Sequence, residues 1–109
     1  MNDKDEKRKN KMINDYCKKA NKQIIVKAIQ YDGSNISDCM MFVGGYKIYQ
    51  ILNFKKGIVI NAIEVNKKEK KILNGYYITK ATSGKIDVYS ENAFKEEFET
   101  VSEVKDNDK

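Results

Sequence analysis

The sequence has no histidine, no proline and no tryptophan among its 109 residues, and arginine occurs once, at Arg8. Histidine is the commonest general base, metal ligand and catalytic-triad member, so its absence excludes zinc hydrolysis and Ser-His or Cys-His mechanisms. The phosphate-binding motifs GxxxxGK(S/T) and GxGxxG are also missing, as is any spaced CxxC pair. We therefore expect a protein that is not an enzyme and that uses no metal or cofactor.

Long apolar runs and clustered cysteines are missing too. No segment approaches the roughly 20 apolar residues that a membrane-spanning helix needs, and the charged N-terminus lacks the apolar core of a signal peptide. The two cysteines, Cys17 and Cys39, lie in different kinds of segment and are expected to stay free in a reducing compartment. These features predict a cytoplasmic protein without membrane contact.

Positive charge is concentrated at the N-terminus. Residues 1–22 hold eight Lys or Arg against four Asp or Glu, whereas residues 23–109 hold thirteen against twelve, so most of the net charge of +5 comes from the first segment. Arginine makes the bidentate contacts to guanine and phosphate, and a chain with a single arginine is poorly equipped for base-specific recognition. Weak, non-specific binding of nucleic acid through residues 1–22 is the alternative that remains.

Residues 1–22 are predicted to form a basic arm, with a disordered tip followed by a marginal helix. The helix prediction rests on sparse apolar residues at helical spacing, namely Met12, Ile13, Tyr16, Cys17 and Ala20. Such an arm either binds a partner or is a solvated tail that aids solubility. The folded domain is expected to span residues 23–104, with a disordered tail at residues 105–109.

The middle of the chain predicts a strand, a helix and a hairpin. Residues 23–31 carry apolar side chains on both faces, which is typical of a central strand. Ser34 or Asn35 can cap the helix that follows, and Gly44-Gly45 ends it. The apolar residues of this helix are Ile36, Cys39, Met40, Phe42 and Val43. Residues 46–54 and 58–65 predict a hairpin, and the lysine-rich residues 66–71 predict a charged loop.

Residues 72–98 predict a second hairpin and a C-terminal helix. Asn74-Gly75 and Ser83-Gly84 are turn dipeptides, and the runs after them, at 76–79 and 85–89, have strand composition or alternation. Ser90 can cap the final helix, in which Phe94 and Phe98 lie at i and i+4. The sequence thus predicts an α+β fold, a small antiparallel sheet of about five strands with one helix after strand 1 and a C-terminal helix, preceded by the charged arm.

Tyrosines and lysines are the remaining candidates for a binding surface. The predicted residues are Tyr49, Tyr76, Lys80, Lys85 and Tyr89. Tyr76 and Lys80 should share one face of their strand, and Tyr89 can reach across the hairpin. Aromatic rings beside cations can stack a base or anchor a protein partner. The alternative is that aromatic residues on strands serve the sheet itself.

The order of the segments resembles a family of short proteins encoded by bacteriophages and prophages. The family pattern is an AIQW-type strand, a Gly turn and short helix, a GDWII-type strand, a second Gly turn, and a terminal F-x-x-x-(Y/F)-E helix. The matching residues are Ala28-Ile29-Gln30-Tyr31 with Gly33, Phe42-Val43-Gly44, Gly75-Tyr76-Tyr77-Ile78, Gly84, and Phe94 with Phe98-Glu99. The match covers residues 24–99, with Tyr31 and Tyr77 where the family usually has Trp and Tyr76 where it usually has Asp.

The resemblance implies a phage origin and a compact α+β fold, and it supplies no catalytic residues. By analogy we expect a phage accessory protein, located in the cytoplasm of the bacterial host, that binds and inhibits a host protein or ribonucleoprotein. A CRISPR effector or another defence component is the leading target class. Two alternatives stay open, a sponge that sequesters a nucleotide immune signal and a minor virion or assembly protein. The oligomeric state is also left open.

Overall fold

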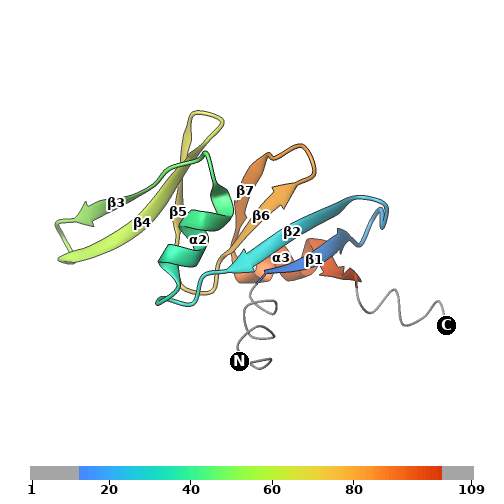
Figure 1. Cartoon of the computed structure of the whole chain (residues 1–109). Coiled ribbons are helices and arrows are strands. Elements are labelled where there is room, and N and C mark those ends of the chain that lie inside the picture. Colours follow the sequence, from blue (N-terminus) through green and yellow to red (C-terminus); the bar gives the residue numbers. More distant parts are fainter. Residues whose placement is uncertain (1–12, 102–109) are drawn as a thin grey trace, which may run out of the picture.

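Two antiparallel sheets and two helices make up residues 13–101, the part of the chain that the computed structural model describes (Figure 1). The strands are β1 (Ile13–Lys18), β2 (Ile25–Gln30), β3 (Ile48–Asn53), β4 (Ile58–Val65), β5 (Lys68–Ile72), β6 (Tyr77–Ala81), β7 (Ile86–Tyr89) and β8 (Phe98–Thr100). The helices are α2 (Ile36–Val43) and α3 (Glu91–Glu97). The strand orders are β7-β6-β2-β1-β8 and β3-β4-β5.

The α+β class is therefore confirmed, but two finer expectations need correction. The described residues form eight strands in two sheets, where the sequence predicted about five strands in one sheet. Helix α2 follows the second described strand, not the first. Both differences arise because three strands were not predicted from the sequence.

β2 is the central strand of the five-stranded sheet, as its two apolar faces predicted. It pairs antiparallel with β1 on one side and with β6 on the other, so that Ile29 lies between Ile13 and Ile78. Ile29 is buried on one face of the sheet and Ala28 on the other. A strand that is covered on both faces needs apolar side chains in both phases, and this pattern is visible in the sequence.

Residues 13–18 form a strand, so the marginal helix expected there is wrong. β1 pairs with β2 and with β8, which places the start of the sheet before residue 23. Cys17 is buried, and Tyr16 lies opposite Thr100 at the other end of the chain. Helical spacing of a few apolar residues is a weak signal that such long-range pairing overrides. Residues 1–12 lie outside the described residues.

The lysine-rich residues 66–71 also contain a strand, which corrects the charged loop predicted there. Asn66 and Lys67 connect β4 to β5 with backbone φ angles of 54° and 63°. Two consecutive positive φ angles are the mark of a tight type I′ hairpin turn. β5 then runs from Lys68 to Ile72, and Ile72 is its one buried residue. A single apolar anchor in a charged segment gave no strand pattern in the sequence.

α3 begins where the sequence placed it, but it does not close the fold. The Ala93 amide donates a 3.3 Å hydrogen bond to the Ser90 hydroxyl, which is the predicted cap. The backbone becomes extended at Phe98, which starts edge strand β8. Phe94 and Phe98 are thus not a helical pair, although their rings lie 4.9 Å apart. Residues 102–109, which include the expected tail, lie outside the described residues.

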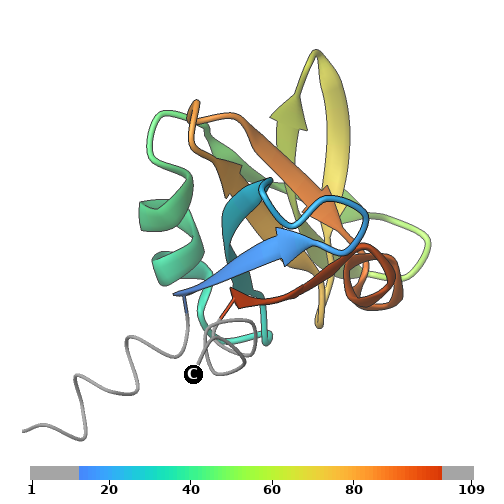
Figure 2. The same ribbon diagram turned by 90° about the vertical axis from the view of Figure 1, so that its right-hand side faces the viewer.

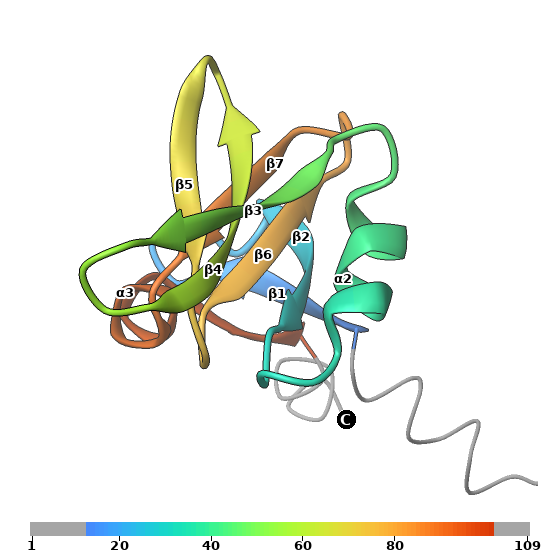
Figure 3. The ribbon, with the colours of Figure 1, turned by 90° about the vertical axis from the view of Figure 1, so that its left-hand side faces the viewer.

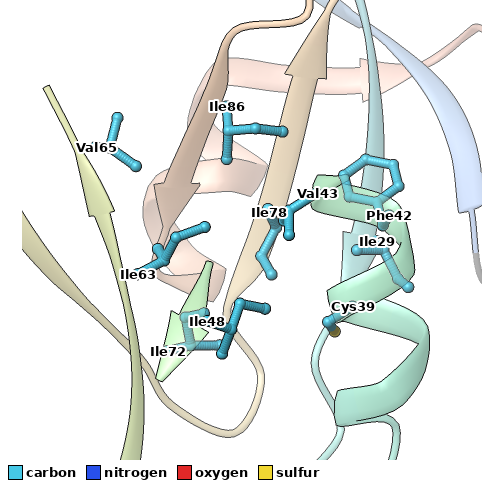
Figure 4. Close-up of a cluster of buried hydrophobic side chains, with 10 residues drawn as sticks. All are labelled: Ile29, Cys39, Phe42, Val43, Ile48, Ile63, Val65, Ile72, Ile78 and Ile86. Atoms are coloured by element: carbon cyan, nitrogen blue, oxygen red, sulfur yellow. The ribbon is translucent and has the colours of Figure 1, made fainter. Parts of the chain in front are cut away.

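The larger core lies between the two sheets and α2 (Figure 4). Isoleucine and valine side chains from both sheets form most of it, and α2 contributes Cys39, Phe42 and Val43. The predicted helix stop is confirmed, since Gly44 has a φ of 62° that favours glycine. Met40, one of the apolar residues of the predicted helix, is exposed. Both cysteines are free, as predicted, and both are buried.

A second, aromatic core lies on the opposite face of the five-stranded sheet, beneath α3. Figure 2 shows α2 and α3 on opposite sides of this sheet. The rings that meet there are those of Tyr16, Tyr77, Tyr89, Phe94 and Phe98. The five-stranded sheet is therefore covered on both faces, whereas the buried residues of β3–β5 in the larger core all lie on one face of their sheet.

Candidate binding surface

The five residues predicted as a binding surface lie in different parts of the molecule. Tyr49 is in β3, where its hydroxyl donates a 3.0 Å hydrogen bond to a carboxylate oxygen of Glu69. The Nζ atom of Lys80 lies 5.1 Å from the centre of the Phe42 ring. Lys85 is exposed and immediately precedes β7, and its carbonyl accepts a 2.9 Å hydrogen bond from the Ala81 amide. Tyr49 therefore lies in a different sheet from the β6–β7 hairpin that carries Lys80 and Lys85.

Tyr89 points toward α3, away from the side of the sheet that holds Lys80. Register places it opposite Tyr77, and its ring packs against Phe94 and Phe98. Burial raises the pKa of Tyr89 to about 12, with a smaller contribution from nearby carboxylates. Tyr89 is therefore a member of the aromatic core, the alternative role that the sequence analysis gave to tyrosines on strands.

Tyr76 lines an open groove of about 330 Å³ beside β5. The other lining residues are Lys68, Glu69, Lys70, Lys71 and Val88. One of these cations is neutralised, because Lys70 Nζ lies 3.2 Å from a carboxylate oxygen of Asp87. The structure thus joins Tyr76 to lysines of β5 and not to Lys80, a pairing that was hidden by the incorrect loop prediction.

A surface that was not predicted from the sequence lies at the outer end of the β3–β4 hairpin, residues 51–60, which we call the hairpin arm (Figure 3). β5 pairs with β4 only from Asn61 onward, so within the hairpin arm β3 and β4 pair only with each other. Four large apolar side chains are exposed there: Leu52 (48%), Phe54 (85%), Ile58 (46%) and Val59 (56%).

Both faces of the hairpin arm are apolar. Leu52 and Val59 are cross-strand neighbours on one face. Ile51 and Ile60 are cross-strand neighbours on the other face and are half-buried. Single exposed apolar residues are common on protein surfaces, but a contiguous group on a projecting element marks an interaction site.

A hydrogen-bonded turn presents the tip of the hairpin arm. The Asn53 side-chain oxygen accepts hydrogen bonds from the amides of Lys55 and Lys56 at 3.1 and 3.2 Å. The Asn53 carbonyl accepts a third from the Gly57 amide at 2.7 Å. Because these bonds fix the backbone, Phe54 is presented on a preformed turn, and a partner that covers it orders little additional chain.

β3 is the one edge strand within residues 13–101 that lacks protection against strand addition along its whole length, and beside it only residues 58–60 of β4 also lack an outer partner. Edge strands are normally blunted by charge, by proline or by short length. β5 is charged at four of five positions, β7 has four residues including Asp87, and β8 has three residues. β3 has six residues, IYQILN, with no charge and no proline. Its outward backbone groups are therefore open to pairing.

The segment that holds the hairpin arm, residues 39–63, carries positive charge only, and the nearest acid on β5, Glu69, accepts a hydrogen bond from Tyr49 of β3. Residues 39–63 contain no Asp or Glu, and their charged residues are Lys47, Lys55 and Lys56. Lys47 precedes β3 and the other two follow it, so cations lie at both ends of an uncharged strand. Glu64 lines the same groove as Lys47, but Lys67 also lies there and offsets its charge. The surface is complementary to an apolar partner with acidic ends.

Comparison of the chain with family models, with curated proteins and with solved structures finds no significant match. In the part of the chain that the structure describes, no three His, Cys, Asp or Glu side chains are grouped so that they could hold a metal ion. Neither α2 nor α3 is long and apolar enough to cross a membrane.

Proposed function

We propose that this protein is a non-enzymatic binding protein that attaches to another protein through the hairpin arm and thereby blocks it. The resemblance to phage proteins supplies the target class, a bacterial host factor such as a CRISPR effector or another defence component. The lack of histidine in the chain supports a role that requires no proton transfer. The hairpin arm supplies the means of attachment.

The observation that carries the proposal is the exposure of four large apolar side chains on one projecting hairpin. Full burial of such a side chain contributes about 1.5–3 kcal/mol. Weighted by the exposed fractions of the four residues, their burial by a partner would contribute about 4–7 kcal/mol before the costs of association. A contribution of this size makes the hairpin arm the energetic centre of a small interface.

The test compares two exposed apolar residues in different places. Phe54 on the hairpin arm and Met41 on α2 are 85% and 81% exposed, so replacing either by serine costs little stability. A photo-reactive amino acid at position 54, in the chain expressed in a bacterial host, should cross-link one host protein that position 41 does not. Phe54→Ser should weaken binding of that purified partner at least about tenfold, and Met41→Ser should leave it unchanged.

Two results would contradict the proposal. One is the same cross-linking pattern from positions 54 and 41, and the other is unchanged affinity of Phe54→Ser for the partner. Inhibition is measured separately. The activity of the partner should fall as the wild-type protein saturates it. The same concentration of Phe54→Ser should leave that activity unchanged.

The groove at Tyr76 favours a second candidate function, the capture of a nucleotide signal. The Tyr76 ring can stack on a base while Lys68 and Lys71 contact phosphates. A cyclic nucleotide or ADP-ribose should then raise the melting temperature of the wild-type protein. Tyr76→Ala and Lys71→Ala should abolish this shift, whereas Lys80→Ala, outside the groove, should retain it. If no nucleotide shifts the melting temperature of the wild-type protein, this function is rejected.

A further inference from the structure

We infer that the open edge of β3 receives an extended strand of the partner, and that this strand is apolar in the middle and acidic at both ends. The inference rests on the proposed function and deepens it, because it names the mode of binding and the chemistry of the partner. It combines three independent observations: the unprotected edge, the two apolar faces, and the distribution of charge.

The other edge strands, β5, β7 and β8, are protected against strand addition, which indicates that the open edge of β3 is a binding site. An exposed, uncharged edge strand invites pairing with other chains, and folded proteins usually prevent this. The chain places charged residues on β5 and keeps β7 and β8 short. β3 alone is longer and uncharged, and it pairs with β4 on one side only. An added strand would satisfy the outward amides and carbonyls of β3.

The two apolar faces of the hairpin arm fit such an added strand. A strand paired with β3 lies about 4.8 Å away, and its side chains alternate between the two faces of the sheet. On one face they would lie beside Leu52, and on the other beside Ile51. Cross-strand contacts of this kind stabilise a sheet, so a partner strand rich in valine and isoleucine would extend both apolar faces at once.

The charges decide between a partner strand and a second copy of this chain. If two β3 strands paired antiparallel over their whole length, Lys47 of one copy would lie near Lys55 and Lys56 of the other. The strand between them has no acid to compensate, so like charges would meet at both ends. A strand with Asp or Glu at its ends converts the same positions into favourable pairs.

The unpaired backbone groups at the edge of β3 also argue against insertion of the hairpin arm into a membrane. Apolar residues beside Lys55 and Lys56 could suggest insertion of the tip into anionic lipid. However, in hydrocarbon every backbone amide and carbonyl must be paired, and each unpaired group costs several kcal/mol. The hairpin arm is a two-stranded ribbon with two open edges, because β5 pairs only with the inner part of β4. Insertion would bury those unpaired groups, whereas strand addition pairs those of β3.

The experiment uses two synthetic peptides with the same Val-Ile-Val-Ile-Val core, one with Asp-Glu at both ends and one with Lys-Lys at both ends. We expect the acidic peptide to bind the full-length protein at least about tenfold more tightly at low salt, with the difference shrinking as salt is added. On binding, amide hydrogen exchange should slow at alternate residues of β3, since only alternate N–H groups point outward. Residues of β7, an edge strand on the other sheet, serve as the internal control.

Proline variants test the backbone directly. Of Tyr49→Pro and Gln50→Pro, the one whose native N–H points outward should fold normally, because proline is tolerated at such edge positions. It should nevertheless weaken peptide binding about tenfold or more. If neither variant folds, the exchange measurement on the wild-type protein still decides the question.

Several outcomes would overturn the inference. They are equal binding of both peptides, binding without slower exchange in β3, self-association of the free protein that protects β3, and co-sedimentation with phosphatidylserine vesicles that Phe54→Ser abolishes. The last two would replace the partner strand by a second copy or by a lipid surface. Failure of the proposed function gives a different result. If Phe54→Ser still binds the acidic peptide and still shows slower exchange in β3, strand addition at β3 is supported, but attachment through the apolar side chains of the hairpin arm is rejected.

Discussion

Two phenylalanines in opposite environments allow the packing to be tested with one type of substitution. Phe94 is 2% exposed and lies at the centre of the aromatic core, stacked on Tyr77 with ring centres 4.0 Å apart. The ring of Tyr16 meets it edge-on at 4.8 Å, which joins α3 to the N-terminal strand β1. Phe54, at the tip of the hairpin arm, is 85% exposed. We predict that Phe94→Ala is strongly destabilising and that Phe54→Ala is nearly neutral.

The magnitudes follow from burial. Truncation of a buried phenylalanine to alanine typically costs about 3–5 kcal/mol, because the transfer free energy is lost and a cavity remains. The buried 15% of Phe54, scaled against about 1.5–3 kcal/mol for a fully buried side chain, gives a loss of about 0.2–0.5 kcal/mol. Small domains have a total stability of about 5–15 kcal/mol, so Phe94→Ala should remove a large fraction of it.

The assay is equilibrium unfolding in urea, followed by far-UV circular dichroism and by tyrosine fluorescence, which is usable because the chain contains no tryptophan. The midpoint should fall sharply for Phe94→Ala and remain near the wild-type value for Phe54→Ala, with unchanged slopes. A loss above about 1 kcal/mol for Phe54→Ala would mean that the tip is packed in solution, contrary to its exposure. A loss below about 1 kcal/mol for Phe94→Ala would refute the aromatic core.

Three further predictions concern the turn, the pH dependence and the thiols. Lys67→Gly should raise the free energy of unfolding by up to about 1 kcal/mol, because Lys67 has a φ of 63° that glycine adopts without strain; an unchanged urea midpoint would contradict this. Burial raises the pKa of Tyr89 to about 12. The unfolded state therefore loses this proton first, and the free energy of unfolding should fall as pH rises from about 10 to 12, less steeply in Tyr89→Phe; identical slopes would contradict this. Cys17 and Cys39 are at most 1% exposed, and burial raises the pKa of the Cys39 thiol to about 11. A thiol reagent at pH 8 should modify neither in the native protein and both in urea, so fast labelling without denaturant is the contrary result.

Elements whose turn and composition signals lie within or next to the element were predictable from the sequence. The expected strand at 58–65 matches β4 (Ile58–Val65), because its β-branched residues and the glycine turn before it are adjacent in the chain. Helix α2 lies between a turn and the Gly44 stop, and both signals are local. The hairpin of β6 and β7 was likewise predicted from its turns. In each case the residues that define the element also mark its ends.

Elements whose support is distant in sequence were not predictable. β1 and β8 pair with each other across the length of the chain, and β8 has only three residues. β5 consists mainly of lysine and glutamate and has one buried residue, Ile72. The candidate site was affected by the same problem, since Tyr76 lies against the lysines of β5, which had been expected in a loop. Propensity and periodicity describe a segment by itself, and they carry no information about which partner it meets.

The hairpin arm shows how a correct strand prediction can hide a binding surface. Residues 46–65 predicted a hairpin because two strand-like runs flank the turn at residues 55–57. Apolar side chains occur in both phases of these runs, a pattern typical of strands covered on both faces. At the inner end, Ile48 and Ile63 are covered by the larger core. At the outer end, Leu52 and Val59 keep about half of their surface exposed. An isolated two-stranded ribbon is marginally stable in water. The hairpin arm therefore carries more apolar surface than the described residues cover. A partner strand on β3 would cover the outer end as the larger core covers the inner end.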